Sequence, residues 1–133
     1  MLKYTLLYII TFVIFLVIDL VWLNIIAKNL YQKEIGTLLL KNPNLVPALL
    51  FYLLFIFALL VLVLIPGIKE GGLLKTLLMA ALFGLTTYAT YDLTNLATLE
   101  GWNLKITVID LIWGTSISTI TTLFGYLIGS KIV

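Results

Sequence analysis

Long apolar stretches alternate with short polar segments along the whole chain. Four of the apolar stretches are long enough to cross the hydrocarbon core of a bilayer as helices, which takes about 20 residues. They cover roughly residues 4–27, 47–65, 73–97 and 105–129. Strands would leave backbone groups unpaired in lipid, so the spans are expected to be helical. The pattern therefore predicts one all-α domain, residues 1–133, an integral membrane four-helix transmembrane bundle.

The segment 28–46, between the first two spans, has a different pattern. Its lysines and apolar residues recur at a rough helical spacing over Lys28–Leu40. This spacing predicts a short interfacial amphipathic helix after the first span. Asn42-Pro43-Asn44 then predicts a turn into the second span. Pro66-Gly67 predicts the end of that span and a loop up to Gly72.

Composition agrees with a lipid environment. Hydrophobic residues make up 62% of the chain and charged residues 11%, whereas a soluble domain is about 45–50% apolar and about 25% charged. Cysteine, histidine and arginine are absent, which excludes disulfides, thiolate chemistry, imidazole bases and histidine metal sites. The net charge of +2 is small and dispersed, so nucleic acid is not an expected partner.

The positions of the lysines bear on orientation. Four spans place both termini on one side of the membrane, and the lysines tie at four on each side. The positive-inside rule needs an excess, so only the free amino terminus favours one arrangement. We expect a multi-pass protein of the cell (inner) membrane with cytoplasmic termini.

Three carboxylates interrupt the predicted spans. An ionised carboxylate within lipid costs about 2.5–3.5 kcal/mol on insertion scales. Asp19 lies near the end of the first span, Asp92 near the end of the third and Asp110 near the start of the fourth. These ends face the same side of the membrane, at depths of roughly 8–12 Å. The three aspartates are therefore expected to form one polar layer, and they are the candidate catalytic residues.

Other polar and aromatic side chains are expected beside this layer. They share helix faces with the aspartates or follow them by about one turn. The second span has Tyr52 as its only polar side chain, so we expect it to be a lipid-facing wall that contributes least. The candidate ligand-binding residues are Trp22, Asn24, Tyr88, Tyr91, Asn95 and Trp113.

Two short motifs stand out. Asp19-Leu-Val-Trp22 and Asp110-Leu-Ile-Trp113 are near copies that enter the polar layer from opposite directions. Such a pair could be a trace of inverted repetition, although the two halves of the chain show no further alignment. Gly125-x-x-x-Gly129 has the spacing of a helix-dimer motif. Packing within the bundle is the commoner role, and a homo-oligomer is the alternative.

Carboxylates without arginine or histidine favour a positive guest, such as a metal ion, an ammonium group or a proton. No metal site is predicted, because each helix supplies a single aspartate, and no cofactor is identified. The leading hypothesis is a pocket that binds or modifies a lipid or small amphiphile, with membrane lipids as partners. The alternatives are a proton- or cation-coupled carrier and a structural or accessory subunit with protonated aspartates between helices. Whether the protein is an enzyme stays open.

The chain resembles domain-of-unknown-function family 2177, a family of small bacterial membrane proteins. The resemblance covers nearly the whole chain and is most specific in the run Tyr88–Thr98; Asp19-x-x-Trp22 and Asp110-Leu-x-Trp-Gly114 also carry it. It implies a four-span membrane protein and brings no assigned activity or site residues. Relatives are often encoded near lipid-modifying enzymes, which favours lipid chemistry.

Overall fold

The computed structural model describes residues 1–133 and contains helices but no strands. Four helical stretches are long and apolar enough to cross a membrane: Leu2–Ile26, Leu45–Gly71, Leu73–Thr98 and Leu104–Gly129. Many of their large apolar side chains are exposed on the outside of the bundle, where lipid would surround them. The predicted all-α membrane bundle is confirmed.

The helical stretches are built from shorter elements. In chain order they are α1 (Leu2–Val21), the π-helical turn η1 (Trp22–Ile26), α2 (Lys28–Ile35), the 3₁₀ turn η2 (Gly36–Leu38), α3 (Leu45–Leu59), the π-helical turns η3 (Leu60–Leu64) and η4 (Gly67–Gly71), α4 (Leu73–Thr98) and α5 (Leu104–Gly129). The short helix predicted after the first span is α2. Asparagine side chains cap α3 and α5, where Asn44 accepts from the Val46 N–H and Asn103 from the Ile106 N–H.

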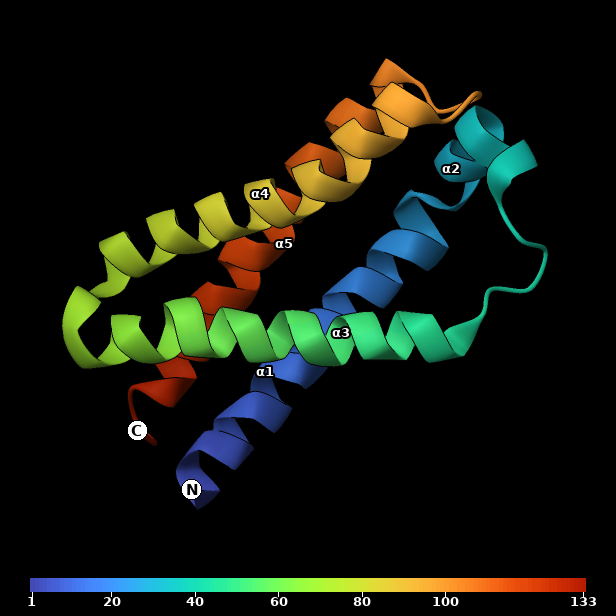
Figure 1. Ribbon diagram of the computed structural model, residues 1–133. Helices are drawn as coiled ribbons and strands as arrows, with labels where there is room; N and C mark the ends of the chain where they lie inside the picture. Colours follow the sequence, from blue (N-terminus) through green and yellow to red (C-terminus); the bar gives the residue numbers. More distant parts are fainter.

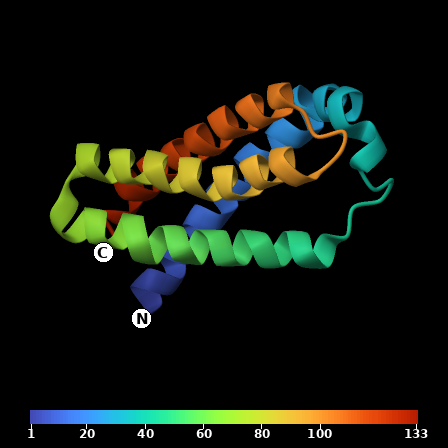
Figure 2. The ribbon, with the colours of Figure 1, turned by 45° about the horizontal axis from the view of Figure 1, so that its top comes forward.

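The helices form a splayed bundle. Figure 1 shows α4 and α5 side by side and antiparallel, with α1 beside α5 and α3 crossing α1. Helices α3 and α4 meet at the end where they are joined and diverge towards the other end. Figures 1 and 2 both place α2 close to the connection between α4 and α5. Both termini lie at the same end of the bundle (Figure 1), as an even number of spans requires.

The second span is longer than the sequence indicated. The expected end at Ile65 and the expected loop 66–72 are wrong, because π-helical turns continue through Gly71. Pro66 lies inside this stretch, between the two π-helical turns, and its missing N–H leaves one backbone carbonyl of the preceding turn without a helical donor. Gly67 packs against the side chain of Thr76, leaving no room for a Cβ. The chain reverses only at Gly72, whose φ of 74° is a conformation that glycine adopts without strain.

Glycines bring the helices into close contact. A Cβ on Gly84 of α4 would lie 2.5 Å from the backbone oxygen of Gly114 on α5. A Cβ on Gly125 would lie 2.9 Å from Leu64, and one on Gly129 would lie 2.8 Å from Leu7. Small residues are how helices approach closely in lipid. Both glycines of the Gly125-x-x-x-Gly129 motif therefore pack within the bundle.

Gly84→Ala is expected to destabilise the bundle. The new methyl group would meet a backbone oxygen, which cannot rotate away, so α4 and α5 must separate. Overpacking of this kind costs about 1–3 kcal/mol. Thermal unfolding in detergent micelles measures the effect, with Ala97→Val as the control because Ala97 is exposed on the same helix. An unchanged unfolding temperature for Gly84→Ala would contradict the close crossing.

Candidate functional site

The three aspartates lie near the same end of the bundle. Asp19 is in the last turn of α1. Asp92 precedes the end of α4 at Thr98, and Asp110 follows the start of α5 at Leu104 by the same number of residues. Asp19 and Asp110 are linked through the stacked Trp113 and Trp22 rings and Tyr31, and Asp110 is also a neighbour of Asp92. The structure thus brings these carboxyls into one region, which we call the carboxyl layer.

Asp19 is buried, with 6% of its surface exposed, and has two donors. The Tyr52 hydroxyl of α3 donates to Oδ2 at 2.5 Å. The Trp113 indole N–H of α5 donates to Oδ1 at 3.1 Å. One carboxyl therefore connects the first, second and fourth spans.

Asp110 is half-buried and belongs to a second network. The Tyr31 hydroxyl of α2 donates to its Oδ1 at 2.9 Å. The Trp22 indole N–H in turn donates to the Tyr31 hydroxyl at 3.1 Å. Burial raises the pKa of Tyr31 well above its usual range, and the neighbouring charge of Asp110 adds to this. Tyr31 therefore stays a hydrogen-bond donor at any physiological pH.

The two networks meet at a pair of tryptophans. The Trp22 and Trp113 rings stack with their centroids 4.3 Å apart and their planes 9° from parallel. Each tryptophan is connected to the aspartate of the other motif. Trp113 donates directly to Asp19, and Trp22 donates to Tyr31, which donates to Asp110. This reciprocal arrangement gives the repeated Asp-x-x-Trp motif a geometric meaning.

Asp92 differs from the other two aspartates. It is fully buried, and neither of its carboxyl oxygens accepts a hydrogen bond from a donor group of the protein. The Asp110 carboxyl is a polar neighbour of Asp92. Two carboxyl groups attract each other only when one of them holds a proton, so a shared proton is the contact that suits this pair.

Of the remaining candidates, Tyr88, Tyr91 and Asn95 belong to α4, whereas Asn24 lies apart from the carboxyl layer. Tyr88 packs its ring on Gly114 and edge-on to Phe55 at 6.2 Å, and the charges of Asp19 and Asp110 both reach it. Tyr91 is 56% exposed and meets the Trp102 ring at 5.5 Å.

Asn95 is half-buried, one turn further along α4 than Tyr91. Asn24 lies apart, because it is exposed and donates to the Leu20 backbone oxygen of its own helix.

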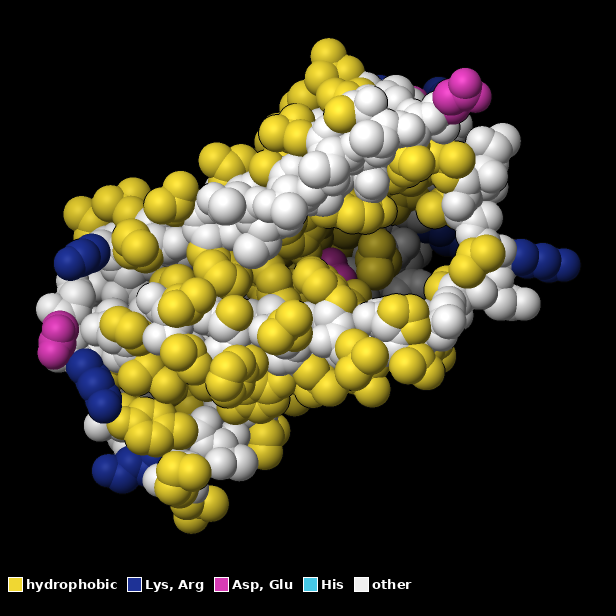
Figure 3. All heavy atoms as spheres, viewed as in Figure 1, with side chains coloured by type: hydrophobic (Ala, Val, Ile, Leu, Met, Phe, Trp, Pro, Cys, Tyr) yellow, Lys and Arg dark blue, Asp and Glu magenta, His cyan; other side chains and the backbone are white.

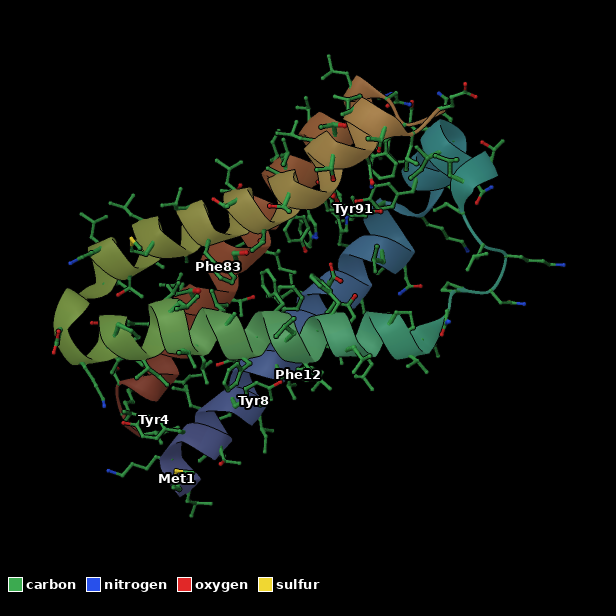
Figure 4. All side chains as sticks on the ribbon, in the orientation of Figure 1. Met1, Tyr4, Tyr8, Phe12, Phe83 and Tyr91 are labelled. Atoms are coloured by element: carbon green, nitrogen blue, oxygen red, sulfur yellow. The ribbon has the colours of Figure 1, made fainter.

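A hollow leads to the carboxyl layer. Figure 3 shows it between the diverging parts of α3 and α4, with acidic atoms visible at its bottom. In Figure 4, Phe83 and Tyr91 lie on the side of α4 that faces this gap. Met1, Tyr4 and Tyr8 line a separate apolar groove on α1, away from the layer (Figure 4). No three acidic side chains lie close enough to hold a metal ion.

Helix α2 covers one end of the layer and is held there by polar contacts. Lys105 pairs with Glu34 at 3.1 Å, and the Asn103 amide donates to Glu34 at 3.1 Å. The Lys105 ammonium lowers the pKa of Glu34 below its usual range, so this carboxylate stays ionised in mildly acidic solution.

Sequence reasoning missed two residues of the layer, Tyr31 and Tyr52. The second span is not merely a lipid-facing wall, because Tyr52 donates to Asp19. A signal existed, since Tyr52 is the only polar side chain of its span and lies roughly 8 Å from the predicted start of that span at Pro47. For Tyr31 the sequence held no comparable signal, because its contact depends on how α2 folds back.

Tyr52→Phe is expected to destabilise the protein by about 1–3 kcal/mol, because it leaves a buried carboxyl oxygen without its donor. Thermal unfolding in micelles checks this. Tyr126→Phe is the matched control, since the Tyr126 hydroxyl makes no hydrogen bond to the protein. Equal unfolding temperatures for the two variants would show that Tyr52 does not support Asp19.

Comparison with known proteins agrees with this architecture. A family described as "Predicted membrane protein (DUF2177)" matches residues 4–127. No curated protein and no solved structure matched the chain. Because the match spans nearly all of the sequence, the chain belongs to this family of multi-pass membrane proteins.

Proposed function

We propose that the protein binds a lipid or small amphiphile in the hollow between α3 and α4, with the polar head of the guest against the carboxyl layer. One observation carries the proposal: acidic atoms are visible at the bottom of a hollow that lies between two membrane spans. Such an opening faces the bilayer rather than the aqueous phase.

The walls suit the tail of such a guest. Phe55 of α3 and Phe83 of α4 meet edge-to-face at 5.2 Å, and Tyr88 meets Phe55 edge-on at 6.2 Å, so aromatic rings bridge the two spans beside the hollow. Aromatic walls above a polar floor are the usual composition of a site for a small apolar ligand with a polar group. The paired carboxyls Asp92 and Asp110 could also divide into an acid and a base, and modification of the guest would use that pair.

A specific observation favours a second candidate, a proton- or cation-coupled carrier. The hydroxyls of Ser118, Thr121 and Thr122 on α5 are buried and make no hydrogen bond. They continue from Asp110 towards the opposite end of the bundle. Water or a transported ion would satisfy them, whereas a purely structural role for the aspartates leaves them unexplained.

Lipids retained through purification test the proposal. The wild-type protein is expected to hold one class of amphiphile above its share of the membrane, as measured by mass spectrometry. Asp110→Asn and Asp92→Asn should each reduce that enrichment at least about tenfold, which corresponds to about 1.4 kcal/mol. Glu100→Gln is the control, because it removes one negative charge at an exposed position near the same end.

The outcomes separate the candidates. A retained fraction that mirrors the bulk membrane in every variant would refute amphiphile binding. Uptake of a cation into proteoliposomes driven by a pH gradient, lost in Asp92→Asn, would establish the carrier instead. Unchanged behaviour of all variants in both assays would leave the aspartates a structural role.

We also propose that the protein lies in the inner membrane with cytoplasmic termini, so that the carboxyl layer is in the outer half of the bilayer. The chain has no native cysteine, so single cysteines report topology directly. Glu100→Cys is expected to react with an impermeant maleimide added to spheroplasts, and Lys3→Cys to be protected. The reverse labelling pattern would overturn this orientation.

A further inference from the structure

We infer that the guest of this site is an amphiphile with a single cationic nitrogen head that carries N–H donors, bound at Asp110 and Asp92. This inference rests on the proposed function and adds the chemical class of the headgroup. Its evidence is the charge and hydrogen-bond balance of the carboxyl layer.

No positive side chain compensates the layer. The chain has neither arginine nor histidine, and the single ion pair in the structure joins Lys105 to Glu34. A buried charge without a partner costs several kcal/mol. A positive guest supplies the charge that the protein omits, whereas an anionic head would add to the repulsion.

The acceptors of the layer are incompletely used. Asp19 already has its two donors, Tyr52 and Trp113. Asp110 accepts one hydrogen bond, at Oδ1, and Asp92 accepts none although it is fully buried. These oxygens have no donor group of the protein and can accept from a guest, and hydrogen bonds between an ammonium group and a carboxylate are among the strongest. The side of the layer formed by Asp110 and Asp92 is therefore the binding side.

Aromatic rings also belong to the carboxyl layer. The Trp22 and Trp113 indoles are held in place through their N–H groups, and the Tyr88 ring lies among the same charges. The faces of such rings attract a cation. Fixed rings lose little conformational entropy when the guest arrives.

Binding is expected to displace a proton. In the free protein a proton shared by Asp92 and Asp110 keeps the pair from carrying two charges. The positive charge of an ammonium head at Asp110 balances the second carboxylate in place of the shared proton, so this proton is released to the solvent. The guest enters as a cation and one proton is released, which conserves the charge of the site.

A headgroup series tests the inference on the full-length protein in maltoside micelles. Dodecylammonium, dodecanol and dodecyl sulfate share one chain and differ in head charge. Tryptophan fluorescence reports binding, because Trp22 and Trp113 lie in the site, and a pH indicator in weak buffer reports proton release. Dodecylammonium is expected to bind at least about tenfold more tightly than dodecanol, with release of about one proton, and dodecyl sulfate is expected not to bind.

Matched variants then locate the site. Asp92→Asn should weaken dodecylammonium binding at least about tenfold and abolish proton release. Glu100→Gln removes an exposed carboxyl group near the same end of the bundle and should leave both unchanged. The headgroup series on the wild-type protein decides the question even where Asp92→Asn fails to fold.

Three other binding results would contradict the inference or the proposed function. Equal binding of dodecanol and dodecylammonium would overturn the cationic head while leaving amphiphile binding intact. Tighter binding of dodecyl sulfate would overturn it as well. If none of the three probes binds and no amphiphile is retained on purification, the proposed function itself fails.

Discussion

The arrangement of this bundle depends on the need of intramembrane carboxyl groups for hydrogen-bond donors. Apolar side chains give spans little reason to associate, because lipid is as apolar as they are. Asp19 draws donors from α3 and α5, and Asp110 is joined to α2 and η1 through Tyr31 and Trp22. These contacts fix how segments distant in sequence lie against one another.

The glycines determine how closely the spans approach one another. Gly84 and Gly114 let α4 and α5 cross with backbone nearly in contact, and Tyr88 packs on Gly114. Asp92 lies about two turns further along α4 than Gly84, where it is fully buried and no donor of the protein reaches its oxygens. These oxygens without a donor are the reason why we propose this place as the binding site of the guest.

The repeated Asp-x-x-Trp motif contributes contacts between the first and fourth spans. Its spacing puts aspartate and tryptophan on one helix face, and its two copies enter one layer from opposite directions. In the structure Trp113 of the second copy donates to Asp19, and Trp22 of the first copy donates to Tyr31, which is the donor to Asp110. The stacked indoles then join the two networks. Mutual dependence of this kind makes the first and fourth spans one unit.

The sequence alone determined the four helical spans, the short helix after the first and the end of the bundle at which the aspartates lie. Those features follow from hydrophobic length and helical rise, which are local. Only the tertiary structure decided that Tyr52 and Tyr31 join the layer, that Asn24 stays outside it and that π-helical turns carry the second span to Gly71. Such outcomes depend on the rotation and crossing of each helix. These are set by glycine contacts and donor–acceptor pairs between segments far apart in the chain, and no periodicity along one helix encodes them.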